Sequence, residues 1–144
     1  MTKKRGVTLM ELLFVAAIFM LVATLLMPFV NMAKERSRRI WCEKNLRNIR
    51  LALGAYALEH GEDFPKELKE LYPNYITEQA MFDCPASKAI GTPDRPEYIY
   101  TAGLKALSPA KSVVVEDIDG NHGKRGKYLL RIDGSIDWVA FSAK

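Results

Sequence analysis

The sequence predicts an α+β fold in which one long N-terminal helix packs against a small antiparallel β-sheet. An apolar run begins close to the N-terminus and continues into an amphipathic segment with no strong helix stop between them. Four short β-type segments follow in the C-terminal half, and an Asp-Gly pair separates the last two. The chain of 144 residues has room for this helix and one small head domain.

The long helix is expected to begin near Val7 and to end at residues 60–61, where His-Gly provides a stop signal. Such a helix would be about 80 Å long at 1.5 Å per residue. Its first half, residues 7–30, is apolar apart from Glu11 and a few mild residues. About 20 apolar residues span a bilayer as a helix, so this half is expected to cross a membrane. Pro28 is expected to kink the helix without ending it.

The second half of the helix, residues 31–61, is amphipathic. Its polar surface is strongly basic and carries Lys34, Arg36, Arg38, Arg39, Lys44, Arg47 and Arg50. Apolar or ring-bearing residues recur at spacings of three and four, at Cys42, Leu46, Ile49, Leu53, Tyr56 and His60. This stripe needs a cover, and the C-terminal half of the chain is the candidate.

The head, residues 62–144, is expected to begin with a short helix over residues 65–72. The turn-rich segment 73–96 follows as a loop that wraps the domain. Strands are predicted over residues 98–101, 112–115, 128–132 and 136–141, with a hairpin at Asp133-Gly134.

The charge of the chain is concentrated at its N-terminus. The formal net charge of +4 comes from 21 basic and 17 acidic residues. Lys3, Lys4 and Arg5 account for most of the excess, because 18 basic and 17 acidic residues remain without them. Positive charge beside an apolar span is a topology signal that stays in the cytoplasm. The rest of the chain therefore gives weak support for nucleic-acid binding.

One carboxylate, Glu11, stands near the start of the apolar run and is part of a specific motif. A charge in this position is costly in lipid, by roughly 2.5–3.5 kcal/mol near a bilayer centre, and a plain membrane anchor does not need it. MTKKR followed by GVTLMELL resembles the processing site of type IV prepilins and of type II secretion pseudopilins. The resemblance implies cleavage after Gly6 by a prepilin peptidase and N-methylation of Val7. It also implies that Glu11 pairs with the terminal amine of a neighbouring subunit. Val7 departs from the phenylalanine usual in that family.

The resemblance implies a structural function rather than catalysis. The chain would be a pseudopilin, or a major or minor pilin, of a type IV pilus-like or type II secretion filament. Residues 1–6 would be the leader, residues 7–30 the membrane span and filament core, and segment 73–96 the variable part of the head. The location implied is the bacterial inner membrane, with a single pass and the C-terminal domain in the periplasm or outside. Partners would be the peptidase, identical or related subunits and an inner-membrane assembly platform.

Two other functions stay open on the sequence alone. One is a membrane-anchored extracytoplasmic binding module that never polymerises and keeps its leader. The other is a DNA-uptake pilin that contacts DNA through its basic helix, for which a solvated helix face is the simpler explanation. An enzyme is not predicted, because neither His60 nor His122 is recognisably paired with a nucleophile and no phosphate-binding glycine loop is present.

The two cysteines, Cys42 and Cys84, predict either a disulfide or a pair of buried thiols. Outside the cytoplasm an even count favours the disulfide. A closed loop of about 40 residues would contribute on the order of 3–4 kcal/mol in the chain-entropy model. Neither cysteine has a partner at the local spacing typical of zinc ligands, so a zinc site is not expected.

A calcium site is the one cofactor suggested by the sequence, and none is required by the predicted function. Asp117, Asp119 and Asn121 stand at alternate positions in EDIDGNHG, and oxygen ligands suit this cation. The resemblance to major pseudopilins also implies a calcium site in a loop near the sheet. The alternative is that the three are ordinary turn residues.

Overall fold

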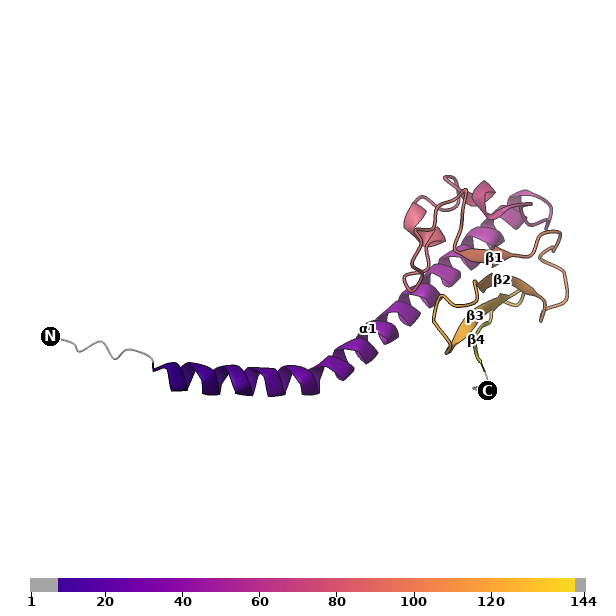
Figure 1. Ribbon diagram of the computed structural model, residues 1–144. Coiled ribbons are helices and arrows are strands. Elements are labelled where there is room, and N and C mark those ends of the chain that lie inside the picture. The colour runs from indigo at the N-terminus through magenta and orange to yellow at the C-terminus, as the bar shows by residue number, and fades with distance from the viewer. Residues whose placement is uncertain (1–7, 142–144) are drawn as a thin grey trace. The chain divides into compact units, whose positions relative to one another are not determined.

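A computed structural model of the chain describes residues 8–141. It confirms the predicted α+β arrangement (Figure 1), with one long helix, α1 (Leu9–Glu59), followed by two 3₁₀ helices, η1 (Leu68–Leu71) and η2 (Gln79–Phe82). Four strands complete the head: β1 (Tyr98–Tyr100), β2 (Val113–Asp117), β3 (Gly126–Arg131) and β4 (Ile136–Ala140). The predicted leader and Val7 lie outside the described residues.

Helix α1 runs through Pro28 without interruption. It ends at Glu59, where Gly61 adopts a left-handed backbone with φ of 64° and the Glu62 N–H donates to the Ala57 carbonyl over 2.8 Å. The chain forms two compact units, one reaching to Arg36 and one beginning at Ser37. The helix therefore belongs to both units.

The sheet is an antiparallel meander with the strand order β1-β2-β3-β4. In β3 buried and half-buried residues alternate, with Tyr128 and Leu130 on the buried face. The strand positions agree with the prediction to within two residues, but β2 extends to Asp117. Asp117 was predicted in a turn, yet it is a fully buried strand residue. Its pairing with Tyr98 on β1 places it inside the sheet.

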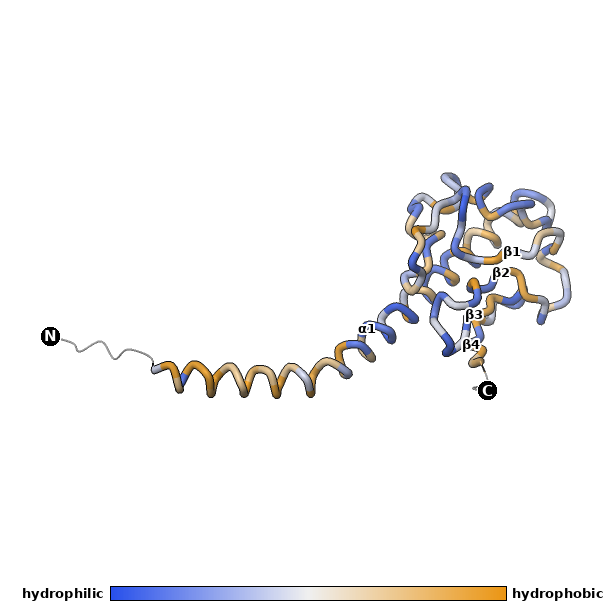
Figure 2. The backbone as a smooth tube through the Cα atoms, in the orientation of Figure 1, coloured by the Kyte–Doolittle hydropathy of each residue, from blue (hydrophilic) through white to orange (hydrophobic). Residues whose placement is uncertain are grey.

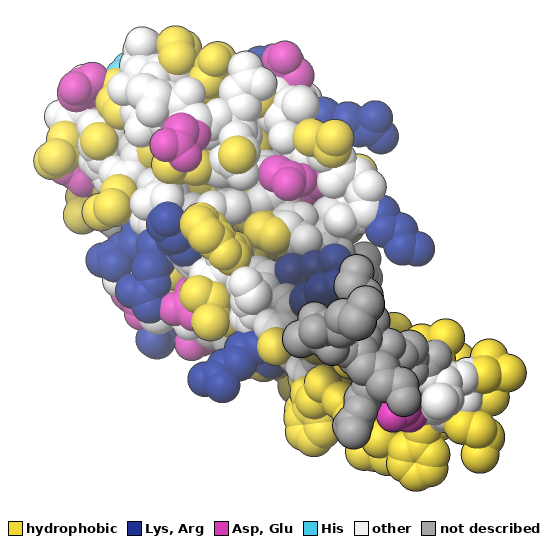
Figure 3. Space-filling view, turned by 90° about the vertical axis from the view of Figure 1, so that its left-hand side faces the viewer, with side chains coloured by type: hydrophobic (Ala, Val, Ile, Leu, Met, Phe, Trp, Pro, Cys, Tyr) yellow, Lys and Arg dark blue, Asp and Glu magenta, His cyan; other side chains and the backbone are white. Residues whose placement is uncertain are grey.

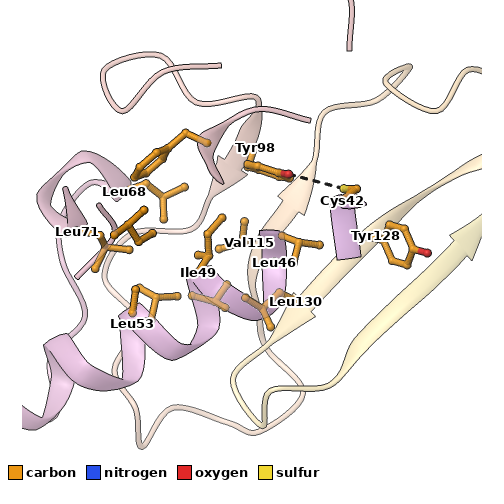
Figure 4. Packing of buried hydrophobic residues seen from close by; sticks show 14 of the residues in the cluster. Cys42, Leu46, Ile49, Leu53, Leu68, Leu71, Tyr98, Val115, Tyr128 and Leu130 are labelled. Atoms are coloured by element: carbon orange, nitrogen blue, oxygen red, sulfur yellow. Dashed lines mark hydrogen bonds between the residues drawn. The ribbon is translucent and has the colours of Figure 1, made fainter. Parts of the chain in front are cut away.

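The core of the head lies between the second half of α1 and the sheet (Figure 4). It confirms most of the predicted stripe, because Cys42, Leu46, Ile49 and Leu53 are buried. The prediction is wrong for the last residue of the stripe, because His60 lies beyond the last helical residue and is exposed. The His60 ring instead stacks on Tyr56, with 3.8 Å between ring centroids.

The connection between helix and sheet is less helical than predicted. Within residues 65–72, the structure has one 3₁₀ turn, η1, whose apolar residues Leu68 and Leu71 are buried. The loop 73–96 contains a second 3₁₀ turn, η2, which the sequence analysis did not predict. Phe82 in this turn is fully buried, so the loop contributes to the core.

The Asp133 side chain holds the hairpin turn between β3 and β4, and the stability of the head is expected to depend on its charge. One carboxylate oxygen accepts hydrogen bonds from the Ser135 N–H at 2.9 Å and the Ser135 hydroxyl at 2.6 Å. The other accepts from Lys111 Nζ at 2.9 Å. These bonds, first the one from the Ser135 hydroxyl, hold the pKa of Asp133 well below its ordinary value. The carboxylate therefore stabilises the fold above its unfolded-state pKa of about 3.9, and this stabilisation is lost as pH falls below it.

We expect Asp133→Asn to lower the melting temperature (Tm) at pH 7 and to lower it less as the pH approaches 2. The neutral amide imitates the protonated carboxyl, so the wild-type protein loses its advantage in acid. Thermal melts of both proteins in non-ionic detergent, at a series of pH values and followed by near-ultraviolet circular dichroism, measure this difference. A difference in Tm that does not change between pH 7 and pH 2 would contradict it.

Candidate functional site

The N-terminal unit is an apolar helix segment exposed along its length. Every residue from 8 to 34 is exposed, and most of this segment is hydrophobic (Figure 2). α1 is the one helix among the described residues that is long and apolar enough to cross a membrane. Exposed apolar patches of this size mark a membrane or protein contact. The unit therefore presents a surface for lipid or for other helices.

Glu11 caps the start of this helix. Its Oε2 accepts hydrogen bonds from the Thr8 N–H at 2.9 Å and the Thr8 hydroxyl at 3.1 Å. The Glu11 N–H in turn donates to the Thr8 hydroxyl oxygen at 3.3 Å. This reciprocal pattern is a capping box, formed by Thr and Glu three residues apart. The T-x-x-E spacing signals this capping role in the sequence, which was not predicted for Glu11 above. Gly6 and Val7, the other predicted processing residues, lie outside the described residues.

The basic stretch of α1 is partly engaged in contacts within the head. The Arg39 guanidinium lies over the Trp138 ring at 3.7 Å, and Arg47 pairs with Glu43 at 2.6 Å. Lys44 Nζ lies 4.4 Å from the centre of the Trp41 ring. Acidic side chains are interspersed with basic ones on the face of the head seen in Figure 3. These contacts favour the solvated-face interpretation over a dedicated nucleic-acid surface.

Four chemically reactive side chains meet in the interior of the head. They come from four places in the chain: Cys42 from α1, Cys84 from the loop after η2, Asp117 from the end of β2 and His122 from the β2–β3 connection. Their sulfur, nitrogen and oxygen atoms all lie within 4.8 Å of one another. All four residues are buried, none more than 3 % exposed. We call these four residues the buried cluster.

Direct contacts link the members of the buried cluster. Cys42 Sγ donates to Asp117 Oδ1 at 3.0 Å, and Cys84 Sγ lies 3.7 Å from His122 Nε2. His122 Nε2 lies 3.5 Å from Asp117 Oδ2, which also accepts the Tyr128 N–H at 2.9 Å. The two cysteines are free thiols in the structure. This matches the buried-thiol alternative rather than the predicted disulfide.

Burial and hydrogen bonding oppose each other at the ionisable groups of the cluster. Burial raises the pKa of the Asp117 carboxyl, while the bonds from Cys42 and Tyr128 lower it. Contacts with Cys42, and more weakly with His122, hold the pKa of Cys84 below its ordinary value. The same sulfur contact and burial raise the pKa of Cys42. The pKa values of the two thiols are thus shifted in opposite directions.

The three residues suggested as calcium ligands have different surroundings in the structure. Asp117 is buried in the cluster, whereas Asp119 is exposed and pairs with Lys127 at 2.9 Å. Asn121 donates through Nδ2 to the Glu97 carbonyl at 3.3 Å. The three residues therefore have separate partners, because β2 continues to Asp117 and directs its side chain into the core. No local pattern in the sequence indicated that His122 would join this cluster.

Comparisons with known proteins give no match: no family model, curated protein or solved structure is significantly similar to this chain.

Proposed function

We propose that the chain is a structural subunit of a filament of the type IV pilus or type II secretion class. The observation that carries this proposal is the exposed apolar segment of α1, which has a single carboxylate, Glu11, near its start. Such a segment lies in the membrane before assembly and packs among the helices of other subunits afterwards. The GVTLMELL motif at the same place supports the proposal.

The proposed function assigns a different role to each unit. The apolar side chains of the helix leave water or lipid on assembly and pack against other helices, whereas the head remains outside the filament core. A carboxylate within an apolar helix bundle is stable only when a positive group matches it. A free amine at Val7 of a neighbouring subunit is such a group, and its pairing with Glu11 would set the axial register of the filament.

A membrane-anchored binding module shares the apolar helix but needs no processing, so cleavage separates the two functions. We expect co-expression with a prepilin peptidase to remove residues 1–6 and leave a methylated Val7. Intact-mass analysis and N-terminal sequencing of the protein from membranes measure both changes. As a control, Gly6→Leu should block cleavage while leaving membrane insertion unchanged. A leader that stays in place beside an active peptidase would overturn the filament proposal.

A further inference from the structure

We propose that Cys42, Cys84, Asp117 and His122 bind a zinc ion that cross-links the interior of the head. The proposal is independent of the filament function, because it concerns the head alone. Two thiolates, an imidazole and a carboxylate are ligands that zinc accepts in closed, four-coordinate structural sites. Among the described residues, this is the one group of three or more such side chains positioned to hold a metal.

The distances within the buried cluster fit a tetrahedral ion. Zinc bonds of about 2.0–2.3 Å at tetrahedral angles separate neighbouring ligand atoms by about 3.4–3.8 Å. The observed separations are 3.7 Å between Cys84 Sγ and His122 Nε2 and 3.5 Å between His122 Nε2 and Asp117 Oδ2. Cys42 Sγ is 3.0 Å from Asp117 Oδ1. The other ligand atoms lie within 4.8 Å of one another, so binding an ion would require them to move closer by up to about 1 Å.

Groups around the cluster would orient its ligands. The Tyr128 N–H fixes Asp117 through Oδ2, and the Tyr98 hydroxyl lies 3.8 Å from Cys42 Sγ (Figure 4). The His122 ring lies edge-on to Trp138 and Tyr128, with centroid separations of 5.4 and 6.0 Å. Outer contacts of this kind hold metal ligands in place, and the surrounding rings exclude water. Four protein ligands leave no open coordination position, so the site would be structural and not catalytic.

The ion would also explain why a carboxyl group and two thiols share a buried space. A buried carboxylate is costly unless charge or hydrogen bonds match it, and a divalent cation does so directly. The bound ion would connect α1, the loop 73–96, β2 and the β2–β3 connection. A small domain buries a limited apolar core, so a metal cross-link between these segments would add to its stability.

Cobalt substitution of the full-length protein tests the proposal. Metal-free, reduced protein in non-ionic detergent is titrated with Co²⁺ alone and then with Zn²⁺. We expect one equivalent of Co²⁺ to produce the intense visible bands of tetrahedral coordination together with thiolate charge-transfer bands, and Zn²⁺ to remove both. Zinc should raise Tm by about 10 °C or more. Protein purified without chelators should contain one zinc per chain.

Matched variants identify the ligands. Cys84→Ser and His122→Gln should each alter the cobalt spectrum and weaken binding at least about tenfold. His60→Gln and Asp119→Asn, which change the exposed histidine and the exposed aspartate, should leave the spectrum unchanged. The wild-type titration is decisive even if a ligand variant fails to fold. A featureless spectrum, octahedral cobalt bands, or a Cys42–Cys84 disulfide in protein prepared with zinc present would each overturn the proposal.

Discussion

A Glu11→Gln variant is expected to enter the membrane and lose its leader normally, yet to be absent from filaments. Glutamine keeps an acceptor oxygen, so it can still accept the hydrogen bonds that Thr8 donates in the capping box. It lacks the negative charge, however. If the charge pairs with the amine of a neighbouring subunit, its removal leaves that amine unmatched inside the apolar filament core, where an uncompensated charge costs several kcal/mol.

Thr8→Ala is the matched control because it alters the cap and keeps the charge. The alanine lacks the hydroxyl that both donates to Glu11 Oε2 and accepts the Glu11 N–H. Loss of a cap costs about 1 kcal/mol at a helix end, which a long membrane helix tolerates. We therefore expect Thr8→Ala subunits to assemble.

Sheared filaments and membranes from cells that carry the assembly machinery, probed by immunoblot, provide the readouts for both variants. Filaments of Glu11→Gln in wild-type amounts would show that the charge has no role in assembly. A Thr8→Ala subunit that fails as Glu11→Gln does would assign Glu11 to the helix cap instead.

Local patterns in the sequence predicted the elements of the fold because those patterns reflect local physics. The 3.6-residue period located the buried stripe of α1, and alternation with an Asp-Gly turn located β3 and β4. The errors occur where tertiary contacts decide. His60 fits the period of the stripe, but the helix ends one residue before it. Asp117 is polar and close to a glycine, so it resembles a turn residue, yet its hydrogen bonds come from α1 and β3.

The buried cluster could not be predicted from spacing for the same reason. Zinc motifs are recognisable when ligands occur in pairs two to five residues apart. Here the two cysteines are 42 positions apart, and Asp117 is 75 positions from Cys42. The cluster exists because the stripe of α1 faces the sheet and the loop 73–96 closes over both. The cysteine count indicated two of the four residues of the buried cluster, whereas Asp117 and His122 join them only through the fold.

Leu46→Ala is expected to lower the free energy of unfolding of the head by about 3–4 kcal/mol. Leu46 is fully buried on α1, and its core includes Ile49 from the same helix and Val115 and Leu130 from the sheet (Figure 4). Truncation removes the apolar contacts of the side chain and leaves a cavity. A helix on one side and a hydrogen-bonded sheet on the other limit how far the surroundings can collapse into it.

Leu51→Ala makes the same chemical change on the same helix at a residue that is 69 % exposed. Its cost in free energy of unfolding should remain within about 0.5 kcal/mol, as for most surface substitutions.

Urea denaturation in non-ionic detergent, followed by near-ultraviolet circular dichroism, reports on the aromatic packing of Tyr128 and Trp138 in the head. The apolar N-terminal segment contains no tyrosine or tryptophan in residues 8–34, so its micelle-bound helix adds little to this signal. Equal losses for the two variants would mean that α1 does not present the stripe to the sheet. The buried cluster, which begins one helical turn before Leu46 at Cys42, would then lose its geometric basis as well.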